Sequence, residues 1–246
     1  MTTVKCISPI DGSVYAERET LSTEAAQDAV ARARRAQKAW AARPLQERVD
    51  LVMAALKEIE NSTDRMTEEL AHQMGRPVRY GGEFGGLQER TSHMAKIAAD
   101  ALAPKVIEES DAFSRKIMRE PHGVVFVVAP WNYPYMTANN TIAPALIAGN
   151  SVILKHASQT ILVGEHLADA YRAAGVPEDV TEWTTKWSKI QLELEGLLFF
   201  VELPLSTVLL GRWHLPGLLS QLGKALHELA ELNNEGTADF VPQVRN

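Results

Sequence analysis

Cysteine is almost absent from this sequence, since the 246 residues contain only Cys6. A single thiol excludes an internal disulfide, and such sparing use of cysteine is typical of reducing compartments, so we expect a cytoplasmic protein. An excess of basic residues is also missing, because the formal net charge is −6. That charge argues against nucleic acid or an anionic membrane as the main partner.

Long uninterrupted apolar runs are missing as well. The N-terminal stretch Met1–Cys6 shows no apolar segment of the kind that a secretory signal requires. A membrane-spanning helix needs about 20 mostly apolar residues. The most apolar window, Leu192–Leu210, is interrupted by acids and a proline: Glu193, Glu195, Glu202 and Pro204. Attachment to a membrane through this window is therefore the less favoured alternative.

What is present is an ordinary globular composition, 46% hydrophobic and 23% charged. Asp11–Gly12 predicts a tight hairpin turn near the N-terminus. Apolar residues at helical spacing then predict four helices: one from Ser22 or Thr23 to about Ala42, a second that begins at Pro44, a third from Ser62 or Thr63 to Met74, and a fourth that ends at about Leu102. The glycine pairs Gly81–Gly82 and Gly85–Gly86 lack the strand and the Lys-Ser/Thr of a phosphate loop, so a loop or helix boundary is favoured.

Histidines offer no metal site by their spacing. His72, His93, His214 and His227 have no partners at the intervals that ligand sets use, so surface or core packing is expected for them.

Residues 123–180 have the pattern of a β-α-β-α unit. The run Gly123–Val128 is apolar and β-branched, which predicts a strand buried on both faces, and Pro130 and Pro134 end it. The following elements are predicted as a helix, a strand and a helix at Thr137–Ala148, Ser151–Leu154 and Ile161–Ala174. Asn132 and Lys155 thus stand at the carboxyl ends of successive strands, the edge at which open α/β sheets bind ligands.

Three motifs in this unit resemble the aldehyde dehydrogenase superfamily: Ala129-Pro-Trp-Asn-Tyr-Pro134, Ile142-Ala-Pro-Ala-Leu-Ile-Ala-Gly-Asn150 and Val152-Ile-Leu-Lys155. The segment Lys155-His-Ala-Ser158 resembles the semialdehyde dehydrogenase branch, and the likeness covers about residues 7–180. It implies an α/β fold with a helical N-terminal layer at 1–122 and part of a Rossmann-like, parallel cofactor sheet at 123–180. Residues 181–246 are predicted to be a tail unlike the family.

The resemblance also implies an activity, the oxidation of an aldehyde, with a semialdehyde as one candidate, to a carboxylic acid by NAD or NADP. Asn132 would donate its side-chain amide to the oxyanion, and its alternative is an asparagine that only forms the turn. Lys155 would bond the cofactor ribose, and its alternative is a solvated lysine at a strand end. The backbone of Ala129, Pro130 and Trp131 would flank the cofactor, although Trp131 and Tyr133 are equally compatible with core packing.

Ser158 stands where many NAD-preferring members of the family have a glutamate, which repels a 2′-phosphate. Serine removes that repulsion, so NADP is favoured over NAD. The segment Ser114–His122 resembles the family's oligomerisation element, so a homo- or hetero-oligomer is expected.

The departures from the family concern the catalytic chemistry. No cysteine follows Cys6, which precedes the first hairpin and is interpreted as incidental, and the Glu-Leu-Gly-Gly segment that carries the general base is absent. We therefore predict a truncated and inactive form, with a tail that is either a read-through or frameshift product or an evolved replacement. The alternative is a non-enzymatic pseudoenzyme that binds nucleotide or docks on a full-length subunit.

In the tail, Leu197–Val201 and Thr207–Leu210 are predicted as strands or one buried helix, and Leu215–Leu232 as a helix.

Overall fold

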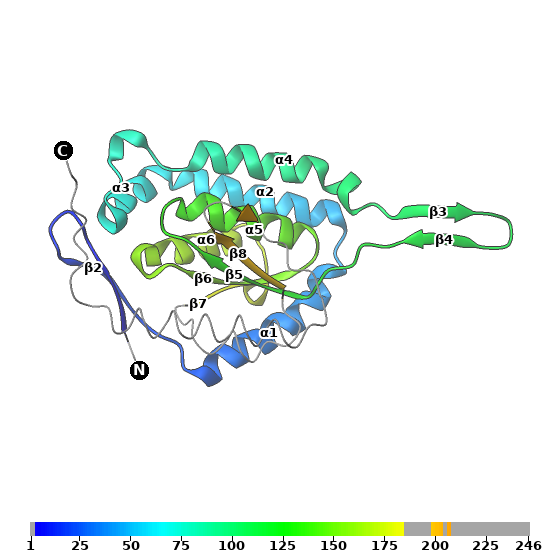
Figure 1. Cartoon of the computed structure of the whole chain (residues 1–246), viewed down its shortest axis with the longest axis horizontal. Coiled ribbons are helices and arrows are strands. Elements are labelled where there is room, and N and C mark those ends of the chain that lie inside the picture. The colour runs from blue at the N-terminus through cyan, green and yellow to red at the C-terminus, as the bar shows by residue number, and fades with distance from the viewer. Residues whose placement is uncertain (1–2, 185–197, 204–205, 208–246) are drawn as a thin grey trace. The chain divides into compact units, whose positions relative to one another are not determined.

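The computed structural model describes residues 3–184, 198–203 and 206–207, drawn in colour in Figure 1. The chain divides into two compact units, Met1–Leu209 and Leu210–Asn246, and every described residue belongs to the first. The helix predicted at Leu215–Leu232 and the strand residues after Thr207 lie outside the described residues. Within the described ranges, no helix is long and apolar enough to cross a membrane.

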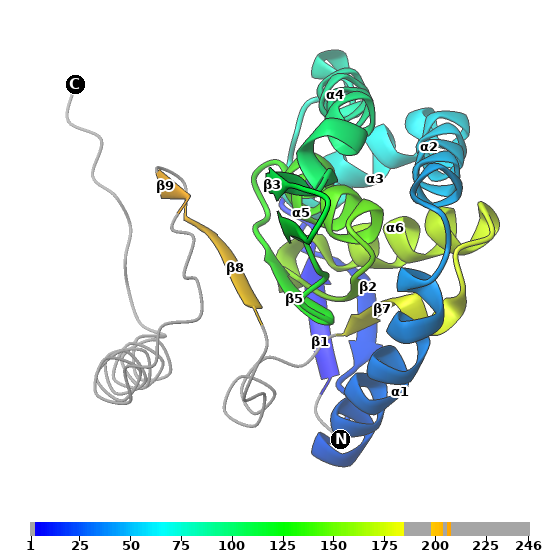
Figure 2. The same ribbon diagram turned by 90° about the vertical axis from the view of Figure 1, so that its right-hand side faces the viewer.

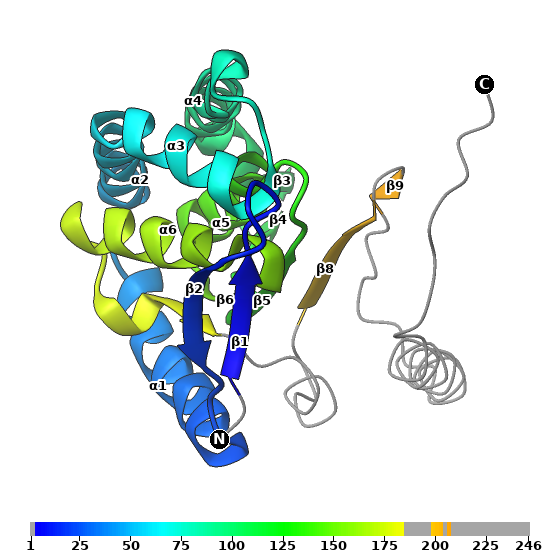
Figure 3. The same cartoon turned by 90° about the vertical axis from the view of Figure 1, so that its left-hand side faces the viewer.

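The chain begins with the predicted hairpin, which Figure 3 shows beside the main sheet. Strand β1 (Thr3–Ile7) pairs antiparallel with β2 (Val14–Glu19). Between them Gly12 has a φ of 75°, a left-handed conformation that glycine adopts without steric strain, and Asp11 Oδ1 accepts a hydrogen bond of 3.0 Å from the Ser13 N–H.

Four helices follow, close to the predicted positions: α1 (Thr23–Ala41), α2 (Leu45–Asn61), α3 (Thr63–Met74) and α4 (Phe84–Leu102). Ser22 caps α1, since its Oγ accepts a hydrogen bond of 3.1 Å from the Ala25 N–H. Gly75, with a φ of 76°, ends α3 in the left-handed conformation that helix C-termini favour. A short 3-10 turn, η1 (Val78–Tyr80), links α3 to α4.

A second hairpin, β3 (Lys105–Glu109) with β4 (Ser114–Ile117), extends away from the helices (Figure 1). Every residue of both strands is exposed. The predicted edge strand at Ser114–His122 is therefore present but ends at Ile117, before Pro121, and its partner β3 was not predicted.

The main sheet has the strand order β7-β6-β5-β8-β9. Its first four strands are parallel, and the short β9 runs antiparallel to β8. Their bounds are β5 (Val124–Ala129), β6 (Ser151–His156), β7 (Thr181–Thr184), β8 (Leu198–Leu203) and β9 (Ser206–Thr207).

The β-α-β-α unit predicted at 123–180 accounts for only two strands of this sheet, β5 and β6, because β7 and β8 extend the sheet beyond Val180. Of the two alternatives for Leu197–Val201, the strand is confirmed from Leu198 onward, and Leu197 lies outside the described residues. Since β8 pairs with β5, the edge of β5 that would otherwise be open carries a hydrogen-bonded neighbour.

The side chains of β5 alternate between two cores, as the period of a strand requires. Val124 and Phe126 pack against α1 on one face, whereas Val125 and Val127 pack against the helices of the other face. Figure 2 shows α1 on one side of the sheet and α5, α6, α2 and α4 on the other. Phe126 is 0% exposed, and burial of such a side chain contributes about 1.5–3 kcal/mol.

Helix α5 (Pro134–Ile147) follows β5, and α6 (Ile161–Ala173) follows β6 through the turn η2 (Ser158–Thr160). The predicted start of α5 at Thr137 is too late. Pro134 occupies the first helical turn, where proline has a suitable φ and needs no N–H donor, so it both ends the strand segment and begins the helix.

Candidate functional site

The predicted site residues lie at one edge of the sheet because β5 and β6 are parallel and in register. Val128 pairs with Lys155 and Ala129 with His156, so both strands end at the same level. Pro130, Trp131 and the asparagine of the motif follow directly after Ala129. The structure therefore brings the Asn132 turn and the Lys155–Ser158 segment to the same carboxyl edge.

The turn between β5 and α5 is exposed to solvent. Trp131 is 53% and Tyr133 51% exposed, so core packing is wrong as the explanation of these two aromatic residues. Asn132 is exposed too, and its Oδ1 accepts a hydrogen bond of 3.1 Å from the Tyr133 N–H. This bond is the local turn contact predicted as the alternative, and it engages only the oxygen of the amide.

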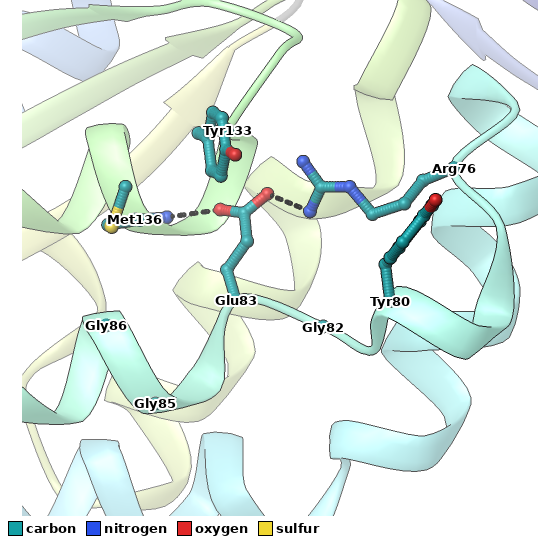
Figure 4. A pocket seen from close by; sticks show the side chains of 8 residues that line it. All are labelled: Arg76, Tyr80, Gly82, Glu83, Gly85, Gly86, Tyr133 and Met136. Carbon is teal, nitrogen blue, oxygen red and sulfur yellow. Dashed lines mark hydrogen bonds and ion pairs between the residues drawn. The ribbon is translucent and has the colours of Figure 1, made fainter.

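An ion pair from the α3–α4 connection holds this turn (Figure 4). Arg76 Nη1 donates to Glu83 Oε1 at 2.6 Å, the contact drawn in the figure. Arg76 Nη2 also donates to the Asn132 carbonyl oxygen at 2.6 Å. Glu83 Oε2 accepts from the Met136 N–H at 2.8 Å, in the first turn of α5. The Arg76 guanidinium carbon also lies 5.0 Å from the centre of the Tyr133 ring, within the range of a cation–π contact.

The Glu83 carboxyl group is almost fully buried, and burial raises its pKa. The Met136 N–H and Arg76 act in the opposite direction, because each stabilises the charged form. A buried carboxylate at the N-terminus of a helix also benefits from the helix dipole.

His156 fixes the turn from the other side. It is 3% exposed, and its Nε2 lies 3.2 Å from the Pro134 carbonyl oxygen. Because a carbonyl can only accept, Nε2 carries the proton and Nδ1 accepts from Thr160 Oγ1 at 3.1 Å. Burial lowers the pKa of His156 to about 4, so the ring is neutral at pH 7.

Lys155 and Ser158 differ in their surroundings. Lys155 is partly buried near the end of β6, and burial lowers its pKa, so the alternative of a freely solvated lysine is not what the structure shows. Ser158 is exposed at the start of η2.

A pocket of about 330 Å³ opens beside the turn (Figure 4). Gly85 and Gly86 lie in the first turn of α4, so the predicted helix boundary is confirmed there. A Cβ on Gly86 would lie 3.0 Å from Met136 Sδ, which shows how closely α4 approaches α5. The residues lining the pocket are Arg76, Tyr80, Gly82, Glu83, Gly85, Gly86, Tyr133 and Met136.

The surroundings of Cys6 do not suit a catalytic nucleophile. It is 1% exposed, its Sγ donates to the Gln159 carbonyl oxygen at 3.0 Å, and burial raises its pKa. These features keep the thiol protonated and inaccessible, whereas a nucleophile must be an accessible thiolate. Among the described residues, no group of three or more His, Cys, Asp or Glu side chains is arranged to hold a metal ion.

Arg76, Glu83 and His156 were not identified from the sequence as parts of the site. Arg76 and Glu83 lie in a glycine-rich connection without periodicity, and the contacts by which they hold the turn are with residues more than 50 positions further on. His156 offered a weak signal, since it directly follows Lys155 at a predicted strand end.

Comparison with known proteins agrees with this geometry. A model described as "Aldehyde dehydrogenase family" matches residues 1–191, past the predicted limit at Val180. N-succinylglutamate 5-semialdehyde dehydrogenase of Novosphingobium aromaticivorans is 32% identical over 157 residues, covering 63% of this chain and 33% of that protein. Benzaldehyde dehydrogenase (NAD(+)) of Pseudomonas putida is 31% identical over 179 residues, covering 71% and 36%.

Among solved structures, NADP-dependent glyceraldehyde-3-phosphate dehydrogenase from Bacillus halodurans, complexed with NADP, superposes with a TM-score of 0.69 at 32% identity. The aligned part covers 76% of this chain and 40% of that one. The chain thus spans between 33% and 40% of the length of these relatives.

Proposed function

The chain belongs to the aldehyde dehydrogenase family, and from this premise we propose that it carries the cofactor edge and the oxyanion donor of an enzyme that oxidises an aldehyde to a carboxylic acid. The observation that supports the proposal is the common position of Asn132 and Lys155 at the carboxyl edge of paired parallel strands. A nicotinamide cofactor bound at this edge would supply the hydride acceptor of the reaction.

The donor set at this edge fits a dinucleotide. Lys155 is a partly desolvated cation whose ammonium group can donate to ribose hydroxyls, and Ser158 adds an exposed hydroxyl nearby in the sequence. The segment Lys155–Ser158 contains no carboxylate that would repel a 2′-phosphate. We therefore favour NADP over NAD, with Ala129, Pro130 and Trp131 forming the backbone beside the cofactor.

Asn132 serves as the oxyanion donor through the Nδ2 hydrogens of its amide. Its Oδ1 is engaged by the Tyr133 N–H, so the donor end of the amide is the end left for a developing negative charge. The substrate is an aldehyde, and a semialdehyde is the candidate that the Lys155–Ser158 segment favours.

These 246 residues do not complete the thiolate mechanism, because their one cysteine is the buried Cys6. We propose that the chain alone binds nucleotide without oxidising an aldehyde. If the edges and faces of the incomplete sheet are left uncovered, the pure chain should aggregate, and light scattering that shows a clean monomer would count against this expectation.

A second candidate function is docking on another subunit through the β3–β4 hairpin. All residues of both strands are exposed, and the hairpin presents apolar side chains that the described residues leave uncovered: Val106, Ile107, Phe113 and Ile117. The partner would be a second copy or a full-length subunit of the same family.

Isothermal titration with NADP⁺ tests the proposed cofactor edge. Lys155→Met should weaken binding by about tenfold or more, since a hydrogen bond from a charged group contributes about 1.5–3 kcal/mol. The matched control is Lys116→Met on the exposed hairpin, which should leave the affinity unchanged. Equal affinities for wild type and Lys155→Met would contradict the assignment.

A further inference from the structure

We propose that Arg76 and Glu83 are positioning residues, which set the orientation of the Asn132 side chain by holding the backbone on both sides of it. The inference rests on the proposed role of Asn132 as oxyanion donor. Neither Arg76 nor Glu83 is itself placed against a reacting atom.

Glu83 holds the segment after Asn132. Its Oε2 accepts from the Met136 N–H at 2.8 Å, in the first turn of the 14-residue helix α5. The first N–H groups of a helix have no partner within the helix, and a carboxylate there satisfies one of them while favouring the dipole. Since Glu83 is 8% exposed, water does not replace this contact easily.

Arg76 holds Asn132 itself. One guanidinium joins two acceptors, with Nη1 on Glu83 Oε1 and Nη2 on the Asn132 carbonyl oxygen, both at 2.6 Å. The planar fork of arginine can make both bonds at once, whereas the ammonium of lysine is a single point charge on a flexible stem. The stacking of Arg76 on Tyr133 adds a contact to the next residue.

These contacts leave little backbone freedom around Asn132. Its carbonyl is fixed by Arg76, its Oδ1 by the Tyr133 N–H, and the start of α5 by Glu83. An oxyanion donor is effective only at about 2.7–3.1 Å from the position where charge develops, so an exposed asparagine in an unsupported turn would be a poor donor. The ion pair supplies the support that the exposed turn lacks.

The experiment uses the whole chain without nucleotide or aldehyde, labelled with ¹⁵N only at asparagine for NMR. The side-chain NH₂ signals of Asn132 are assigned by their loss in Asn132→Asp. The test variants are Glu83→Gln, which keeps the shape and removes the charge, and Arg76→Lys, which keeps the charge and removes the fork. The matched controls are Glu165→Gln and Arg18→Lys, because Arg18 and Glu165 form an ion pair elsewhere.

We expect both test variants to shift the Asn132 NH₂ signals and both controls to leave them in place. Hydrogen exchange followed by mass spectrometry should show the Met136 N–H exchanging about five- to tenfold faster in Glu83→Gln, because the uncharged amide oxygen is a weaker acceptor than the carboxylate. In Arg76→Lys the carboxylate remains, so exchange at Met136 should stay close to wild type while the Asn132 signals still move. If Arg76 and Glu83 had a purely structural role, both variants would lower the free energy of unfolding. The Asn132 signals and the exchange rate at Met136 would then not respond differently to the two substitutions.

Asn132 signals that coincide with wild type in both variants would overturn the proposal. If Glu83→Gln does not fold, Arg76→Lys decides alone, since it preserves the buried charge pair. The two experiments distinguish a failure of this inference from a failure of the proposed function. A failed NADP⁺ titration with shifted Asn132 signals would contradict the cofactor edge only, whereas unmoved signals with intact NADP⁺ binding would contradict the positioning only.

Discussion

Replacement of His156 with glutamine should remove a large part of the acid sensitivity of this fold. The pKa of the histidine is lowered by burial from 6.5 to about 4, with the bond to the Pro134 carbonyl acting weakly in the other direction. The unfolded chain therefore binds a proton at His156 at a higher pH than the folded chain does. The contribution of the neutral His156 to stability is complete above about pH 6.5 and is lost as the pH drops toward 4.

The size of this loss follows from the difference between the two pKa values. At 1.36 kcal/mol per pH unit, the shift at His156 corresponds to about 3 kcal/mol between pH 6.5 and 4. His166, whose pKa burial also lowers to about 4, adds a loss of the same sign. These two histidines should therefore together take up about two protons on unfolding in this range, and His156→Gln should remove about one of them.

Urea unfolding, followed by circular dichroism at a series of pH values, measures this slope directly. Glutamine keeps a nitrogen donor for the Pro134 carbonyl oxygen, so the variant should still fold at pH 7. His93→Gln is the matched control, because His93 is exposed on α4. An unchanged slope between pH 4 and 6.5 in His156→Gln would refute the assignment of a buried neutral imidazole at this position.

Three further predictions concern the cofactor, the core and the hairpin. Ser158→Glu should weaken NADP⁺ binding by about tenfold and leave NAD⁺ binding nearly unchanged, because the new carboxylate repels the 2′-phosphate; equal losses for both nucleotides in a titration would count against the assignment. Phe126→Ala should lower the free energy of unfolding in urea by about 3–5 kcal/mol, since Phe126 is 0% exposed between α1 and the sheet. Phe113→Ala is the control, and because its side chain is 45% exposed it should lower the free energy of unfolding by less than about 1 kcal/mol. Ile107→Asp on the β3–β4 hairpin should weaken self-association by about tenfold or more in sedimentation velocity. Ile10→Asp is the control, because Ile10 is a similarly exposed isoleucine in the β1–β2 turn, and it should not change self-association. Identical sedimentation of both variants and the wild type would exclude the β3–β4 hairpin as the interface.

The strands and helices that position the site were predictable because their patterns have one explanation. Val124–Ala129 and Ser151–His156 are apolar runs too short for helices and rich in β-branched residues, and both are strands. The start of α5 was misplaced because proline suits both the end of a strand segment and the first turn of a helix, and Pro134 fulfils both roles. Strand β3 was missed because Lys105–Glu109 has no buried face and hence no alternation to detect.

The support of the site was not predictable from local pattern. Arg76 and Glu83 contact residues that are remote in sequence, and their importance depends on burial, which only packing of α3, α4 and α5 determines. The exposure of Trp131 was not predictable either, because an aromatic residue beside a buried strand is usually expected in the core.

The most direct test of the central proposal combines binding and turnover on the pure chain. NADP⁺ binding is measured by titration, and the absorbance of reduced nicotinamide is then followed after addition of N-succinylglutamate 5-semialdehyde or benzaldehyde, the aldehydes named for two relatives. We predict saturable binding that Lys155→Met weakens, and no reduced nicotinamide above the rate of the protein-free control. Sustained reduction would contradict the proposal that these residues lack a working nucleophile, and the absence of binding would contradict the cofactor edge.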